Sequence, residues 1–207
     1  MGISSGSVSY LRFVADPVPD GFEEPYCDAL REHRFREIDL HGDLDKQSGW
    51  VQFDDAFAAD WDPDTLVSRT GMIFLRLRVD TLTIPAVTLK AYTDLAARQR
   101  QTELGRDKLI KRETDALKLE VKKALRKRSL PRMQLLEIVW NVATGEVRLM
   151  STARAGADLF SDLFEKTFGQ KLHQVGLLNV LRLRGLDDAA VDGLALLEPE
   201  RFHLIRR

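Results

Sequence analysis

The sequence predicts an α+β protein, with an antiparallel sheet, one long basic helix and several shorter helices. Short runs of β-forming residues occur in both halves of the chain. These runs and the predicted helices do not follow a strict βαβ alternation, which favours an antiparallel sheet. Residues 85–131 are a long run of strong helix formers between Pro85 and Pro131, and they predict the long helix.

In the first half of the chain, β-rich runs predict strands and an apolar face at helical spacing predicts one helix. The helix spans residues 22–34, with Pro25 in its first turn, where the missing N–H costs nothing. A turn-rich loop occupies residues 54–64. The predicted strands lie at residues 7–14, 35–40, 49–51 and 72–79.

The second half predicts a hairpin, two helices and a last strand. The hairpin joins residues 134–141 to 146–151, with Gly145 at its turn. A helix over residues 153–168 follows, capped by Thr152 and ended by Gly169. The remaining elements are a strand at residues 175–183 and a short helix at residues 187–197.

Composition indicates a globular protein. At 207 residues, 44% apolar and 30% charged, the chain is long enough to bury one core. We expect one unit over residues 1–207, with 1–84, 85–132 and 133–207 as candidate subdivisions. The sequence has no apolar run of ~18 residues and no signal peptide, and it has a single cysteine, Cys27. These features predict a cytoplasmic protein without a membrane partner.

Charge is divided unevenly along the chain. Between Lys90 and Arg132 there are 14 Lys/Arg and 6 Asp/Glu, a local charge of +8. The whole chain has 31 Lys/Arg and 32 Asp/Glu, so the remainder holds 17 against 26, or −9. Lysines three or four residues apart share a helix face, as Lys118 and Lys122 do. Such a row is found on plain solvated helices and at polyanion sites, and the charge alone leaves both interpretations open.

Two other functions compete with polyanion binding. The basic helix is also suited to pairing with an acidic surface, such as residues 16–64 of a second copy, which hold 15 acidic and 4 basic side chains. A metal-dependent nuclease needs carboxylates that converge on two ions. The candidate carboxylates cluster instead in turn-like sequence, where Asp is favoured for local hydrogen bonds. They are Asp39, Asp43 and Asp45, or Asp54, Asp55, Asp60, Asp62 and Asp64.

The order of short motifs resembles the recombination-associated protein RdgC family over nearly the whole chain. The opening strand with Tyr10 and Arg12 lies where that family begins. The next matching elements are Gly49-Trp50-Val51, a strand ending in Ile84-Pro85, the charged helix and Leu130-Pro131-Arg132. A hairpin with Trp140 and Thr144-Gly145, small residues at 151–155, and a helix through Leu163 and Phe168 follow in the same order.

The resemblance implies a bacterial nucleoid-associated protein that binds double-stranded DNA without sequence preference and restrains RecA-dependent recombination. It also implies a homodimeric ring around DNA. The family has been described as an exonuclease, but the sequence has no Walker A loop, no GxGxxG and no HExxH motif, so we expect no cofactor, metal or catalytic residue. The DNA contacts that it implies are Lys108, Lys111, Arg112, Lys118, Lys122, Lys123, Arg126, Lys127, Arg128 and Arg132.

Two departures from the family concern the ring. The family has an aromatic-bearing insertion at a dimer contact just after the Leu-Pro-Arg turn, where this chain runs from Met133 directly into a strand. The family also continues well beyond the segment that matches residues 175–183, so the chain resembles a shortened, C-terminally truncated member. An open dimer and a monomer are therefore alternatives to a closed ring.

Overall fold

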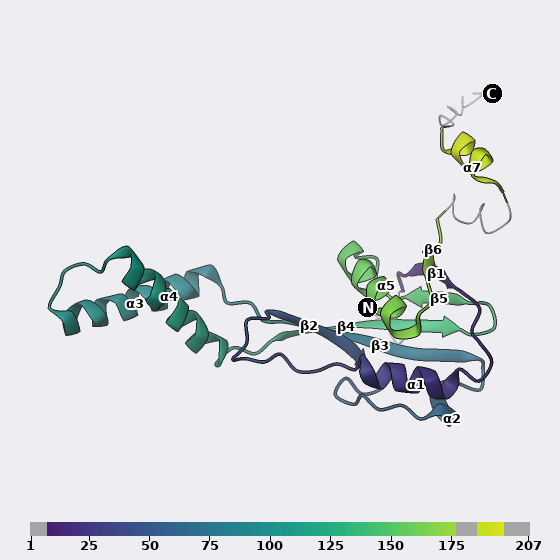
Figure 1. Ribbon diagram of the computed structural model, residues 1–207, viewed down its shortest axis with the longest axis horizontal. Coiled ribbons are helices and arrows are strands. Elements are labelled where there is room, and N and C mark those ends of the chain that lie inside the picture. The colour runs from purple at the N-terminus through teal and green to yellow at the C-terminus, as the bar shows by residue number, and fades with distance from the viewer. Residues whose placement is uncertain (1–7, 177–185, 197–207) are drawn as a thin grey trace, which may run out of the picture.

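The computed structural model describes residues 8–176 and 186–196, and it confirms the α+β class. Six antiparallel strands form one sheet in the order β2-β3-β4-β5-β1-β6 (Figure 1). The strands are β1 Leu11–Ala15, β2 Lys46–Val51, β3 Met72–Thr81, β4 Arg132–Asn141, β5 Glu146–Leu149 and β6 Leu172–Gln174. The helices are α1 Glu23–Glu32, α2 Pro63–Leu66, α3 Ala86–Leu104, α4 Lys111–Arg126, α5 Arg154–Phe168 and α7 Asp188–Ala195.

Helices α1 and α5 cover one face of the sheet and form the core with it. Alternate residues of β3 and β4 point to this face, where Leu75, Leu77 and Ile138 are fully buried. Trp140 of β4 lies between the two helices, because its ring stacks on Tyr26 of α1 and meets Phe164 of α5 edge to face. Burial raises the pKa of Tyr26 to about 12.

The strand predicted at residues 35–40 does not form. The backbone at residues 33–35 instead lies along the outer edge of β2, where the Phe35 N–H donates to the Trp50 carbonyl and the Trp50 N–H donates to the His33 carbonyl. Only one bridge, Arg34 to Trp50, joins them. Gly49 permits this approach, because a Cβ atom there would lie 2.4 Å from the Phe35 backbone.

The stretch predicted as one long helix forms two. Helix α3 ends at Gly105, which adopts the left-handed conformation with φ 60°. The Arg106 N–H then donates to the Gln101 carbonyl, as in a glycine-terminated helix. Helix α4 begins after Ile110, whose N–H donates to the Glu113 side chain. The single-helix prediction was wrong because a glycine at a helix end was taken as part of the helix interior.

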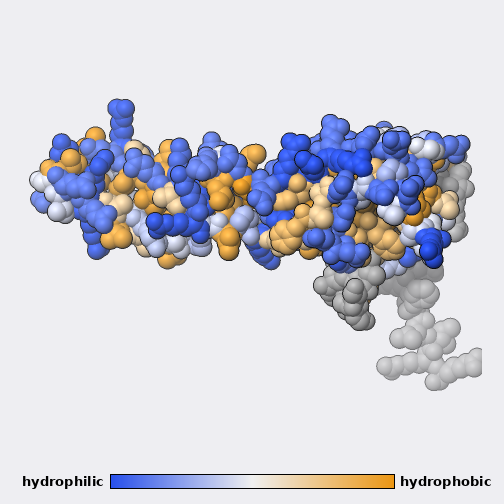
Figure 2. Space-filling view, turned by 90° about the horizontal axis from the view of Figure 1, so that it is seen from below, coloured by the Kyte–Doolittle hydropathy of each residue, from blue (hydrophilic) through white to orange (hydrophobic). Residues whose placement is uncertain are grey.

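We call residues 85–131 the arm, because α3 and α4 lie side by side and project from the sheet (Figure 1). The arm leaves the sheet after β3 and returns at β4, and these two strands pair along all ten residues, from Met72–Asn141 to Thr81–Arg132. Both ends of the arm are therefore fixed at one end of the sheet. Figure 2 shows the arm extending from the body, with apolar side chains at its surface among hydrophilic ones.

The C-terminal predictions had mixed outcomes. Gly169 ends α5 in the left-handed conformation as predicted, but the N-cap is Ala153 rather than Thr152 and makes no side-chain cap. Most of the strand predicted at residues 175–183 lies outside the described residues, and β6 precedes it. The short helix at residues 187–197 is confirmed as α7. No helix in the described part of the chain is long and apolar enough to cross a membrane.

Candidate nucleic-acid interface

The arm presents a dense set of exposed cations. Of the 14 basic residues from Lys90 to Arg132, ten are exposed and make no ion pair within residues 8–176 and 186–196. Only four acidic residues of the same stretch are likewise exposed and unpaired there, namely Asp94, Asp107, Asp115 and Glu120. The ten cations are Lys90, Arg98, Lys108, Lys111, Arg112, Lys118, Lys123, Lys127, Arg128 and Arg132.

Eight of the ten predicted contact residues belong to this exposed set, and the other two do not. Arg126 is 3% exposed, and its guanidinium pairs with Asp45 and donates to the Leu44 carbonyl. Lys122 is half-buried and lies 3.8 Å from the same carboxylate. Arg126 is therefore corrected from a DNA contact to a structural residue, because its side chain faces the body rather than solvent. Lys122 is partly neutralised by Asp45.

The lysine row of α4 runs beside the apolar residues that face α3. Lys111 and Lys118 are seven residues apart, and Lys122 follows four residues later, so these three share one face. Val121 and Leu125 face α3 and help to line a groove between the two helices. Leu125 follows Lys118 by seven residues, so the lysine row borders the apolar side of α4 that packs on α3, and Lys111 and Lys118 are exposed at its edge.

Two of the exposed cations were missed by the sequence prediction. Lys90 and Arg98 lie on α3, and both are exposed without an ion pair in the described structure. Both residues were counted in the local charge of +8. The predicted contacts, however, were taken only from the C-terminal half of the stretch, where basic residues are most frequent. The arm therefore carries exposed cations on both of its helices.

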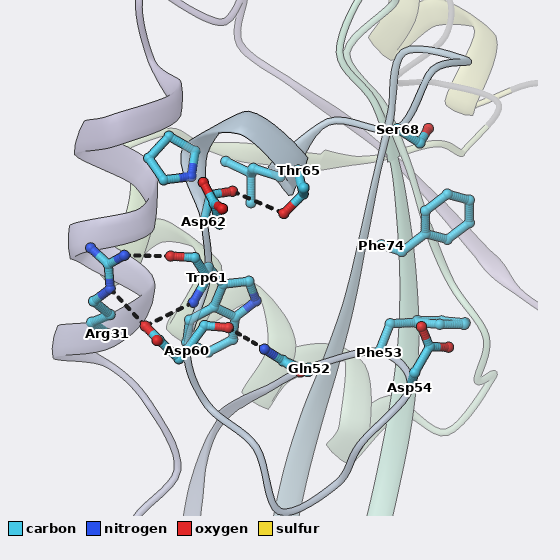
Figure 3. Close-up of a pocket in the computed structure, with 12 residues that line it drawn as sticks. Arg31, Gln52, Phe53, Asp54, Asp60, Trp61, Asp62, Thr65, Ser68 and Phe74 are labelled. Carbon is cyan, nitrogen blue, oxygen red and sulfur yellow. Dashed lines mark hydrogen bonds and ion pairs between the residues drawn. The ribbon is translucent and has the colours of Figure 1, made fainter.

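The body contains a pocket of about 890 Å³ beside β3 (Figure 3). On one side, Arg31 of α1 donates to the Asp60 carboxylate at 3.0 Å and to the Trp61 carbonyl. The Asp60 hydrogen bond is the main cause that raises the pKa of Arg31. Asp54 and Phe74 lie on the opposite side of the pocket. The two hydrogen bonds of Arg31 join the loop before α2 to helix α1.

The aspartates weighed as nuclease ligands are held in local structure. Asp62 accepts a hydrogen bond from the Asp64 N–H and caps α2, and Asp55 accepts one from the Phe57 N–H. Asp39 accepts from the His41 N–H. Across the described residues, no group of three or more His, Cys, Asp or Glu side chains is arranged to hold a metal ion.

The fold and this surface define an α+β protein with a projecting basic helical arm. No protein-family model matches the chain, and no curated protein matches it by sequence.

Proposed function

We propose that the protein binds double-stranded DNA without sequence preference and that the arm is its binding surface. The observation that supports this proposal most is the set of ten exposed cations, nine on the arm and Arg132 at the start of β4, against four exposed acids, all without an ion pair in the described structure. Lysine and arginine side chains that neutralise phosphates release counterions from the duplex, and this gain does not depend on base identity.

The length of the arm suits several phosphates at once. Helix α4 has 16 residues and is therefore about 24 Å long at 1.5 Å per residue. Phosphates follow one another at about 3.4 Å along the axis for each strand, so α4 spans about seven base-pair steps. Arg128 and Arg132 extend the cationic surface from the end of α4 to the start of the sheet.

The resemblance of the motifs to the RdgC family supports a narrower proposal. The protein acts at the bacterial nucleoid in the cytoplasm, forms a homodimer and restrains RecA-dependent recombination. Two glycines of those motifs, Gly49 and Gly145, are required by the packing, because at each position a Cβ atom would lie less than 3 Å from backbone atoms of another segment. No cofactor or catalytic residue enters this proposal.

A second candidate is a protein-interaction arm that pairs with acidic surfaces. It is favoured by one observation, since Asp45 of the acidic segment already pairs with Arg126 and lies near Lys122 within one copy. That contact uses the base of the arm and leaves the exposed cations unpaired. We therefore rank phosphate binding first.

Duplex binding is tested by fluorescence anisotropy with several unrelated sequences of equal length. We expect similar affinities for all of them and a linear fall of log K with log salt, with a slope of about −0.9 for each phosphate neutralised. Strong preference for one sequence, or binding that does not depend on salt, would contradict the proposal. Salt-sensitive self-association without any DNA binding would favour the interaction arm.

A further inference from the structure

The pocket beside β3 lies apart from the proposed DNA-binding surface, and its size suits a small molecule (Figure 3). Its volume of about 890 Å³ falls within the range of about 300–1,000 Å³ that is usual for ligand sites in proteins. The described residues that line it run from Arg31 to Phe74, so all of them belong to the body and lie outside the arm. A ligand in this pocket is therefore recognised by the body alone.

Trp61 brings an unused hydrogen-bond donor to the pocket. The residue is only 8% exposed, and its backbone N–H and carbonyl are both used, by Asp60 and Arg31 respectively. Its indole N–H, by contrast, has no hydrogen-bond partner among the described residues, although the side chain lines the pocket. The indole N–H of a largely buried tryptophan usually finds a partner. This donor therefore favours a ligand that brings a hydrogen-bond acceptor.

Two phenylalanines form the wall that lies across the pocket from Trp61 (Figure 3). Phe53 and Phe74 meet edge to face, with their ring centres 5.4 Å apart. The Arg76 guanidinium lies 4.7 Å from the centre of the Phe53 ring, so this ring already accepts a cation within the protein. Phe74 is 38% exposed, because it points away from the core face of β3. The wall thus offers an aromatic surface to the flat or apolar body of a ligand and to a cation.

The charges that line the pocket are mainly negative. Three carboxylates and one guanidinium, those of Asp54, Asp60, Asp62 and Arg31, give the lining a net charge of −2. Arg31 is not free to hold an anion, because it pairs with Asp60 and with Asp28. Asp54 is exposed and makes no hydrogen bond or ion pair with any described residue. Its carboxylate accepts hydrogen bonds and attracts positive charge, so the lining favours amines and guanidines over phosphates and carboxylates.

We propose that the pocket binds a small organic cation, with its flat or apolar body against Phe53 and Phe74 and its amine or guanidine at Asp54. An acceptor on the body of the ligand receives the indole N–H of Trp61. The aromatic faces stabilise the cation, and Asp54 adds a charge-assisted hydrogen bond. The inference goes beyond the proposed function and does not depend on it, because the pocket and the arm share no described residue.

Tyramine is the probe, because it joins a flat ring and an ammonium group to a hydroxyl that accepts hydrogen bonds. Phenethylamine lacks the hydroxyl, and para-hydroxyphenylacetate carries a carboxylate in place of the amine. Binding to the full chain is followed by the indole signals in proton–nitrogen correlation spectra, and Trp61→Phe assigns the signal of Trp61. We expect tyramine to shift this signal and to leave the signals of Trp50 and Trp140 unchanged, because both of those rings are fully buried in the core. Phenethylamine should bind more weakly, and para-hydroxyphenylacetate should not bind.

Two variants test the roles of the charge and of the aromatic wall. We expect Asp54→Asn to weaken tyramine binding about tenfold and Phe74→Ala to weaken it about three- to fivefold. Both positions are exposed, so the variants should fold, and thermal unfolding checks this. Asp43→Asn is the matched control, because it removes a carboxylate at an exposed position outside the pocket and should bind tyramine as wild type does.

Three outcomes overturn the inference. They are a Trp61 signal that none of the three compounds shifts, equal binding of tyramine and para-hydroxyphenylacetate, and an Asp54→Asn variant that binds as tightly as Asp43→Asn. A signal that moves only with a basic peptide, for which tetra-arginine is the probe, also overturns it, because the pocket would then be a protein-docking surface. Duplex binding by Asp54→Asn should equal that of wild type, so failure here leaves the proposed function of the arm standing.

Discussion

The guanidinium of Arg126, at the end of α4, pairs with the carboxylate of Asp45, the residue before β2. The same guanidinium donates to the Leu44 carbonyl at 2.8 Å, and the Leu82 N–H donates to the Asp45 carbonyl at 2.8 Å. The base of the arm is thus joined to the body at a point distant in sequence. Arg126, which the helical spacing groups with the exposed lysines, therefore anchors the base of the arm to the body.

Replacing Arg126 should lower stability, whereas replacing an exposed neighbour should not. Arg126→Met removes a buried donor and leaves the Leu44 carbonyl and Asp45 without it, so we expect a loss of about 1–3 kcal/mol in the free energy of unfolding. Urea unfolding measures the difference. Lys127→Met is the control, because Lys127 is exposed and makes no ion pair among the described residues. Equal stabilities of the two variants would show that the contact is not structural.

Gly105→Ala distinguishes two helices from one by the sign of its effect. In the left-handed conformation with φ 60°, alanine costs about 1–2 kcal/mol, so the variant should unfold at lower urea. In the interior of one continuous helix, the same change would stabilise the protein by about 1 kcal/mol. Arg98→Ala, at an exposed position of α3, is the control and should change stability little.

Glu146 should stabilise the sheet only while it is ionised. Its carboxylate accepts from Arg148 and from Arg12 of the adjacent strand β1, both at 2.9 Å, and the hydrogen bond from Arg148 is the main cause that lowers its pKa. A pKa lowered by folding gives stability that is present above the pKa of the unfolded chain and is lost as pH falls through the lowered pKa.

Glu146→Gln should therefore be less stable than wild type at neutral pH, by about 0.2–1 kcal/mol for pairs that reach solvent. The difference should vanish at acid pH, where wild-type Glu146 is also protonated. Urea unfolding at both pH values measures it, with Glu37→Gln as a control, because Glu37 is exposed, lies outside the helices and makes no ion pair among the described residues. A deficit that is the same at both pH values would mean that charge is not its cause.

Sequence patterns predicted the sheet well, because local alternation reports which face of a strand is buried. The hairpin around Gly145 and the run that became β3 were found this way. The failures came from contacts that are distant in sequence. Residues 35–40 look extended, but whether they join a sheet depends on the edge of β2 and on the space at Gly49.

For the candidate site, too, local spacing predicted correctly and contacts distant in sequence were missed. Spacing along one helix correctly placed Lys111 and Lys118 on a shared, exposed face. The same spacing assigned Arg126 to that face, because the periodicity of a helix does not show where the rest of the chain packs against it. The groove at Tyr92 and Leu95 was also missed, since the pairing of α3 with α4 follows from the turn at Gly105.

The most direct test of DNA binding by the arm is a pair of charge-matched variants. Lys111→Glu/Lys118→Glu/Lys123→Glu reverses three exposed cations of α4. Arg69→Glu/Lys166→Glu/Lys171→Glu makes the same change of net charge at exposed positions of the body. Duplex affinity is measured by anisotropy as a function of salt. We predict that the arm variant loses affinity for every sequence alike and that its salt slope shrinks by about three, while the body variant stays close to wild type. Equal losses in the two variants, or an arm variant that binds as tightly as wild type, would contradict the assignment of the arm as the DNA-binding surface.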